Sequence, residues 1–129
     1  MTVDVHDYNR RWLQAWTDKD IPALLTFYAE DVVYKDNQTT AGVTGHAALG
    51  AYLAGLFAAT PPMRYEADEV WPTADGFCGR WYCAMSPPDA PEIWMRGFDL
   101  VVMGGDKIVL NEVYVHPLDG PPHRDEIKP

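Results

Sequence analysis

Four long segments with the composition of β-strands follow one another from residue 63 to residue 116, and only short turns separate them. Gly, Pro, Asp and Ser residues, which favour turns, lie between the segments. Strands joined in this way form a mostly antiparallel sheet. The four predicted strands cover residues 63–73, 76–85, 92–103 and 107–116.

The first half of the chain predicts helices instead. Tyr8, Trp12 and Trp16 recur at helical spacing, which indicates an amphipathic helix. Asp20 is placed to cap a second helix, with Pro22 close to its start. The three predicted helices cover about residues 7–18, 21–28 and 46–59, and a short strand over residues 31–35 lies between the second and the third.

Helices first and strands afterwards predict an α+β fold, with the helices on one face of a curved sheet. At 129 residues, the chain has the length of one domain. We therefore expect a single domain over residues 1–129, with its core at about 7–117. Residues 118–129 are rich in proline and charge and predict a tail that is surface-bound or disordered.

Composition narrows the possible partners. The formal net charge is −9, so DNA or an anionic membrane surface would be repelled. The chain shows no secretory leader and no run of 18 apolar residues, which predicts a cytoplasmic protein. Cys78 and Cys83 lie on opposite faces of one predicted strand and are expected to stay unpaired. Five Trp, seven Tyr and four Phe exceed the needs of a core, so some are expected to line a cavity.

Three motifs are typical of one known group of domains: Tyr28-Ala29-Glu30-Asp31, a helix start of the form Gly-x-x-Ala-Leu at Gly45, and a Gly-Asp-Lys-Ile turn over residues 105–108. Over about residues 8–116 the chain resembles the SnoaL-like and ketosteroid isomerase-like branch of the nuclear transport factor 2-like superfamily. The resemblance implies a cone-shaped domain, in which the curved sheet and three N-terminal helices enclose a pocket. It also implies a homodimer and no cofactor.

The resemblance places two carboxyl groups in that pocket. Asp36 falls at the position of the isomerases' general base, and Asp99 falls at that of their protonated aspartate, which donates a hydrogen bond. Such sites hold one ionised and one neutral carboxyl group in the same apolar pocket. We expect apolar surroundings to raise the pKa of Asp36. The alternative is that Asp36 only caps its own loop.

Asp99 shares its strand face with Met95, Val101 and Met103, so a charge there would be costly. Either Asp99 is protonated, or it forms a structural ion pair with Arg80 on the preceding strand.

Arg80 and Tyr82 share one strand face, which the resemblance turns toward the pocket to hold an anion or a carbonyl. The alternative is that Arg80 faces solvent or only neutralises Asp99. Trp81 and Tyr114 are expected on the outer sheet face, where they would support the dimer. Asn111 is expected to face the pocket and to orient a substrate oxygen, or else to bond across the strands.

The chain departs from the isomerases at two of their tyrosines. Trp12 falls at the position of the oxyanion-hole tyrosine and Leu53 at that of a second tyrosine, whereas Tyr28 is retained and is expected to contact the substrate. Trp12 either offers its indole N–H to a substrate or is an ordinary residue of the hydrophobic core. A comparison with limonene epoxide hydrolase fails because one of its paired acids falls on Val113.

The leading hypothesis is a cofactor-independent and metal-independent enzyme that moves a proton on a small hydrophobic carbonyl compound, as an isomerase, cyclase or lyase. Asp36 would be the base. Asp99, with Arg80, Trp12 or Asn111, would stabilise the enolate oxygen. The rival hypothesis is a non-catalytic small-molecule-binding or dimerisation domain of the same fold.

Overall fold

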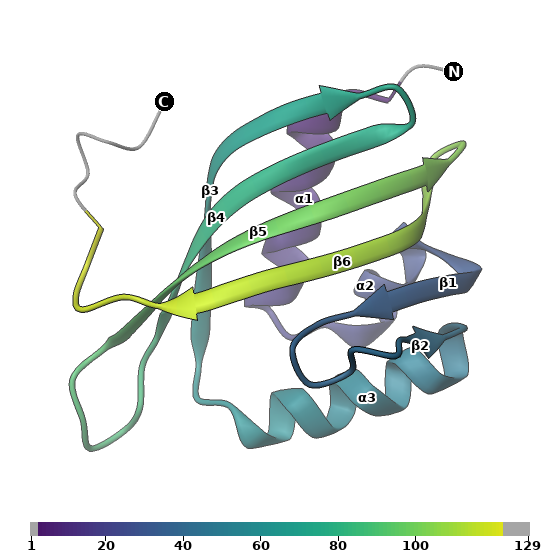
Figure 1. The fold of residues 1–129 in the computed structure, drawn as a ribbon. Helices are drawn as coiled ribbons and strands as arrows, with labels where there is room; N and C mark the ends of the chain where they lie inside the picture. The colour runs from purple at the N-terminus through teal and green to yellow at the C-terminus, as the bar shows by residue number, and fades with distance from the viewer. Residues whose placement is uncertain (1–2, 123–129) are drawn as a thin grey trace.

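The computed structural model describes residues 3–122 and contains three helices and six strands (Figure 1). The three predicted helices and the four long strands are confirmed to within a few residues. A two-residue strand over residues 43–44 was not predicted. Residues 123–129 of the predicted tail lie outside the described part of the chain. The elements are α1 (Val5–Thr17), α2 (Ile21–Phe27), β1 (Tyr28–Lys35), β2 (Val43–Thr44), α3 (His46–Ala59), β3 (Met63–Thr73), β4 (Gly76–Met85), β5 (Ile93–Gly104) and β6 (Lys107–Pro117).

All six strands belong to one open, curved sheet in the order β2-β1-β6-β5-β4-β3. Every neighbouring pair is antiparallel except β1 and β6, which are parallel. The predicted α+β class and the mostly antiparallel sheet are therefore confirmed. Figure 1 shows α1 against one face of the sheet and α3 beside β1 and β2. No helix in residues 3–122 has the length and apolar character needed to cross a membrane.

Side-chain caps fix where the first two helices begin. The Asp4 carboxylate accepts hydrogen bonds from two backbone N–H groups of the first turn of α1, and Asp20 accepts one from Ala23 at the start of α2. These bonds satisfy donors that a helix leaves without partners at its N-terminus. Gly45 precedes α3 with a φ of 89°, a conformation that glycine adopts without steric cost.

Lys19 caps the C-terminal end of α3. Its Nζ donates to the carbonyl oxygens of Phe57, Thr60 and Pro61 at 3.1, 2.7 and 3.0 Å. A cation is favourable at a helix C-terminus because the last carbonyl groups lack partners within the helix. Lys19 thereby joins the turn after α1 to the turn after α3.

The core lies between the concave face of the sheet and the helices. Trp12 and Phe77 make an edge-to-face contact at 6.3 Å, and Leu24 and Ile108 are fully buried beside them. This end of the molecule is filled with side chains. A cavity remains at the other end, between α1, α3 and the sheet.

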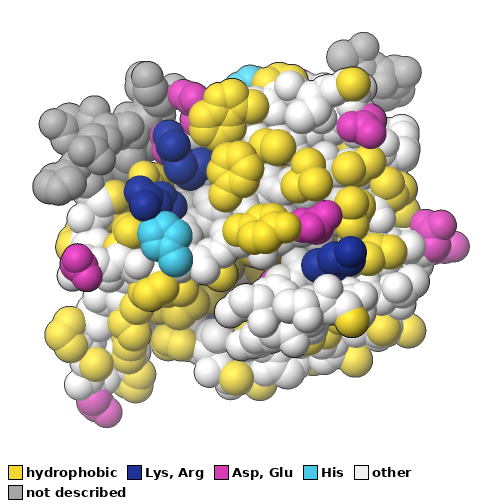
Figure 2. Space-filling model, in the orientation of Figure 1, with side chains coloured by type: hydrophobic (Ala, Val, Ile, Leu, Met, Phe, Trp, Pro, Cys, Tyr) yellow, Lys and Arg dark blue, Asp and Glu magenta, His cyan; other side chains and the backbone are white. Residues whose placement is uncertain are grey.

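The convex face of the sheet is partly apolar and exposed (Figure 2). Trp71, Phe98 and Tyr114 are 38, 40 and 62% exposed. The rings of Trp71 and Phe98 lie 5.8 Å apart, and Phe98 is opposite Tyr114 in the β5–β6 pairing. The outward direction predicted for Tyr114 is confirmed.

Candidate functional site

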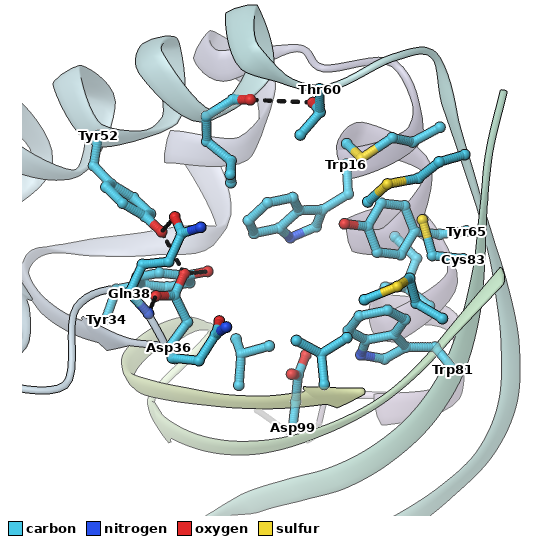
Figure 3. Close-up of a pocket in the computed structure, with 18 residues that line it drawn as sticks. Trp16, Tyr34, Asp36, Gln38, Tyr52, Thr60, Tyr65, Trp81, Cys83 and Asp99 are labelled. Atoms are coloured by element: carbon cyan, nitrogen blue, oxygen red, sulfur yellow. Dashed lines mark hydrogen bonds between the residues drawn. The ribbon is translucent and has the colours of Figure 1, made fainter. Parts of the chain in front are cut away.

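The cavity has a volume of about 210 Å³ and is shown in Figure 3. Its walls are mainly aromatic and aliphatic. A single buried benzene occupies a cavity of about 150 Å³, so this space suits a ligand of one substituted ring. The lining residues are Leu13, Trp16, Tyr34, Asp36, Asn37, Gln38, Tyr52, Leu56, Thr60, Met63, Tyr65, Trp81, Cys83, Met85, Met95, Asp99, Val113 and Val115.

Asp36 lies at the end of β1, next to the exposed residues Asn37 and Gln38, which mark an open edge of the cavity. Its Oδ2 accepts hydrogen bonds from the hydroxyl groups of Tyr52 and Tyr34 at 2.6 and 2.9 Å. Its Oδ1 accepts from the backbone N–H groups of Gln38 and Thr39 and from the Thr39 hydroxyl. Five donors thus surround one carboxylate.

These donors overturn the prediction that the pKa of Asp36 is raised. Burial acts to raise it, but the hydrogen bonds from Tyr52, the Gln38 backbone, Tyr34 and Thr39 together hold the pKa below its ordinary value, because they favour the charged form. Asp36 is therefore ionised at neutral pH. It lines the cavity and caps its loop at the same time, so the two interpretations drawn from the sequence do not exclude one another.

Asp99 lies on the sheet floor of the cavity and is 3% exposed. Burial raises its pKa from 3.8 to about 8, and the nearby donors on Trp81 and Asn111 offset only part of that effect. Both donors lie near the carboxyl group, but Asp99 Oδ1, Trp81 Nε1 and Asn111 Nδ2 have no partner with good hydrogen-bond geometry among the described residues. Asp99 is mainly neutral at pH 7 and can donate a hydrogen bond.

The alternative in which Asp99 pairs with Arg80 is wrong, and so is the prediction that Arg80 and Tyr82 face the pocket. Asp99 is opposite Gly79 across β4 and β5, whereas Arg80 is opposite Phe98. Directly opposed residues share a sheet face, so Arg80 belongs to the outer face.

Each of these two side chains has other contacts there. The Arg80 guanidinium donates from Nε to Asp68 at 2.6 Å and lies over the Trp71 ring. Tyr82 is buried in a separate cluster with Ala84 and Trp94. Neither Arg80 nor Tyr82 lines the cavity.

Trp81 takes the inward position instead, which corrects its predicted outward direction. It is opposite Gly97 in the β4–β5 pairing. A Cβ atom at Gly97 would meet Cζ2 of the indole at 2.1 Å, so any larger residue there would displace the ring. Trp81 also packs against Tyr65, with 4.9 Å between ring centroids. Glycine at position 97 therefore shapes this wall of the cavity.

Trp12, Tyr28 and Asn111 form a buried chain of hydrogen bonds behind the cavity wall. The Trp12 indole donates to the Tyr28 hydroxyl at 3.2 Å, and that hydroxyl donates to Asn111 Oδ1 at 2.9 Å. None of the three lines the cavity, so the prediction that they contact a substrate is wrong. Asn111 accepts through Oδ1, and its Nδ2 is one of the donors near Asp99 that act to lower the pKa of that carboxyl group. Its predicted inward direction is confirmed, and Val113 and Val115 line the cavity on the same face.

Sequence reasoning missed most of the aromatic lining. The resemblance compared Leu53 with an isomerase tyrosine, but Leu53 is buried in the core. Its neighbour Tyr52 is the residue whose hydroxyl group reaches Asp36. Tyr34 could have been found, because it shares a strand face with Asp36, two residues away. Trp16 and Tyr65 carry no sequence signal that separates them from core residues.

The described residues offer no group of three His, Cys, Asp or Glu side chains that could hold a metal ion. The cavity instead combines one ionised carboxylate at its edge, one neutral carboxyl group on its floor and an apolar wall between them. This arrangement can accept a proton at one place and donate a hydrogen bond at another.

Comparison with known proteins gives a family and a fold. A family model described as a SnoaL-like domain matches residues 9–111. No curated protein matches the chain. Among solved structures, a hypothetical protein with a ketosteroid isomerase-like fold from Catenulispora acidiphila DSM 44928, in complex with trimethylamine, is 21% identical to this chain. Its TM-score is 0.74, and the match covers 88% of this chain and 86% of that one.

Two further structures have the same fold. The protein RV0760c from Mycobacterium tuberculosis, in complex with estradiol-17beta-hemisuccinate, is 17% identical with a TM-score of 0.70, over 85% of this chain and 92% of that one. A putative isomerase from Bacillus subtilis is 14% identical with a TM-score of 0.74, over 87% of this chain and 86% of that one. At these identities the likeness shows the fold alone.

Proposed function

Because the chain belongs to the SnoaL-like domain family, we propose that its cavity binds a small, largely apolar carbonyl compound and moves a proton next to the carbonyl group. The observation that carries the proposal is that two carboxyl groups line one cavity in contrasting surroundings: hydrogen-bond donors around Asp36 hold its pKa low, whereas burial raises the pKa of Asp99. Two titratable groups whose surroundings push their pKa values apart are suited to separate acid and base roles.

In the proposed reaction, the ligand carbonyl oxygen accepts a hydrogen bond from the protonated Asp99. The ionised Asp36 removes a proton from the carbon next to the carbonyl group, and the electrons move onto the oxygen as an enolate. Asp99 stabilises that oxygen, and a preorganised donor in a site that excludes water is worth far more than one in water. Asp36 then returns the proton, at the same carbon or at another.

The size and character of the cavity agree with this class of ligand. About 210 Å³ suits one substituted ring. Similar structures also hold organic molecules, trimethylamine in one case and the larger estradiol-17beta-hemisuccinate in another.

Exchange of carbon-bound protons tests the proposal without knowledge of the natural substrate. In D2O at pH 7, we expect the native protein to speed deuterium incorporation at the carbons next to the carbonyl group of phenylacetone, measured by NMR. The control is the protein with the cavity blocked by a non-exchanging ligand of the same size, such as para-xylene. Exchange no faster than in buffer, with phenylacetone bound, would contradict proton transfer.

The second candidate is a small-molecule-binding domain without catalysis. The five hydrogen bonds to Asp36 favour it, because they stabilise the carboxylate and lower its basicity. Under this function phenylacetone binds and its protons do not exchange. The experiment above therefore separates the two candidates.

We also propose that the partner of the outer sheet face is a second copy of this chain. The exposed rings of Trp71, Phe98 and Tyr114 lie on one face, and exposed apolar patches of this kind mark interaction sites. Light scattering of the native protein should give the mass of a dimer, and Phe98→Lys should shift it toward the monomer. A monomeric native protein at every concentration would rule out this partner.

A further inference from the structure

The aromatic side chains of the cavity form one continuous chain around it. The ring of Tyr52 lies 5.7 Å from that of Tyr34, Tyr34 lies 6.3 Å from Trp16, Trp16 lies 6.0 Å from Tyr65, and Tyr65 lies 4.9 Å from Trp81. All five rings line the cavity. The faces of Trp and Tyr rings attract cations placed within about 6 Å of the ring centroid.

Among residues 3–122, one charged group lines the cavity, and it is negative. Asp36 is ionised, Asp99 is mainly neutral at pH 7, and no Lys, Arg or His lines the cavity. Asp36 sits at the Tyr52 and Tyr34 end of the aromatic chain and is ionised at neutral pH. A buried cation needs an opposite charge nearby to offset its lost hydration, and Asp36 supplies one.

Three cations on segments around the cavity have partners of their own. Lys19 reaches the carbonyl of Thr60 at the cavity edge, but three backbone carbonyl groups hold its Nζ. Arg64 pairs with Glu66 and Glu92 on the surface, and Arg80 lies on the outer sheet face with Asp68. Lys35, next to Asp36, borders an adjoining surface groove and does not line the cavity. An anionic ligand inside the cavity would therefore find no cation among the described residues that line it.

We propose that the cavity selects small organic amines in their positively charged form over neutral ligands of the same shape, and that it excludes carboxylates. The ammonium group lies among the aromatic rings near Asp36, and the apolar part of the ligand occupies the rest of the cavity. This inference rests on the proposed function only in taking the same cavity as the ligand site, and it requires no catalysis.

The test is the binding of three ligands that share one ring and one ketone and differ in charge. Para-(aminomethyl)acetophenone is cationic, para-methylacetophenone is neutral and para-acetylbenzoate is anionic at pH 7. By calorimetry at low salt, we expect the amine to bind at least about tenfold more tightly than the neutral ketone, and the carboxylate at least about tenfold more weakly than it.

Two variants show whether Asp36 is responsible. Asp36→Asn should bring the affinities of the amine and the neutral ketone to within about threefold of each other, since the aromatic rings alone then discriminate between them. Asp31→Asn removes the same charge at an exposed position of β1, the strand that precedes Asp36, and should preserve the order of affinities of the native protein. The order measured on the native protein decides the proposal even if Asp36→Asn does not fold.

Equal affinity for the three ligands, tighter binding of the carboxylate, or no binding by any of them would overturn the inference. Its failure is distinct from that of the proposed function. Proton exchange in phenylacetone together with equal affinities would refute only the charge preference. The expected order of affinities without exchange would refute only the catalysis.

Discussion

Replacing Asp36 by asparagine is expected to slow proton exchange in bound phenylacetone by on the order of 10²- to 10⁴-fold, the range typical of a lost general base. The amide is nearly the same size and can still accept a hydrogen bond from the Gln38 backbone or from Tyr52, so the loop should keep its shape. An amide cannot take up the proton, however. Exchange rates measured by NMR at saturating ketone separate this effect from weaker binding.

Asp31→Asn is the matched control for this prediction, because it makes the same chemical change at an exposed residue of β1. It should leave exchange unchanged. Undiminished exchange in Asp36→Asn would remove Asp36 from the reaction. The base would then have to be sought elsewhere in the cavity.

Asp99 should give the protein a pH-dependent stability that Asp99→Asn lacks. Its pKa in the folded protein is about 8, against 3.8 when unperturbed. Between these values the folded protein keeps a proton that the unfolded chain has released, so stability falls as pH rises. About four pKa units correspond to a loss on the order of 5 kcal/mol in the free energy of unfolding, complete near pH 8.

Urea unfolding of the native protein and of Asp99→Asn, from pH 4 to pH 9, measures this effect. As pH rises, the free energy of unfolding of the variant should increase relative to that of the native protein up to about pH 8, and the difference should then stay constant. Asp36, whose lowered pKa acts in the opposite direction at acid pH, is present in both proteins and cancels. Parallel curves over the whole range would show that Asp99 does not hold its proton on folding.

The sequence predicted the inner face of β5 correctly and that of β4 wrongly, for a physical reason. In β5, Asp99 stands among apolar residues at alternate positions, which identifies one face. In β4, four consecutive residues from Trp81 to Ala84 are all buried, because the outer face also carries a buried cluster. Alternation cannot assign faces to a strand that is buried on both sides.

The helix that supplies Tyr52 was equally hard to interpret. Helix α3 is apolar around most of its circumference, so helical periodicity does not show which residues face the sheet and which face the cavity. The resemblance to the isomerases pointed to Leu53, one position away. Contacts between residues that are distant in the sequence, such as that of Tyr52 with Asp36, depend on how the helices and strands are arranged. Local sequence patterns do not predict them.

The aromatic wall also makes the cavity observable without a label. Of the five tryptophans in the chain, Trp16 and Trp81 line the cavity from opposite layers, one on α1 and the other on β4. Indole emission responds to the polarity and contacts of its surroundings, so a ligand that displaces water from this space should alter the intrinsic fluorescence of the protein. The molecule thus carries its own optical reporter for screening compounds of unknown affinity.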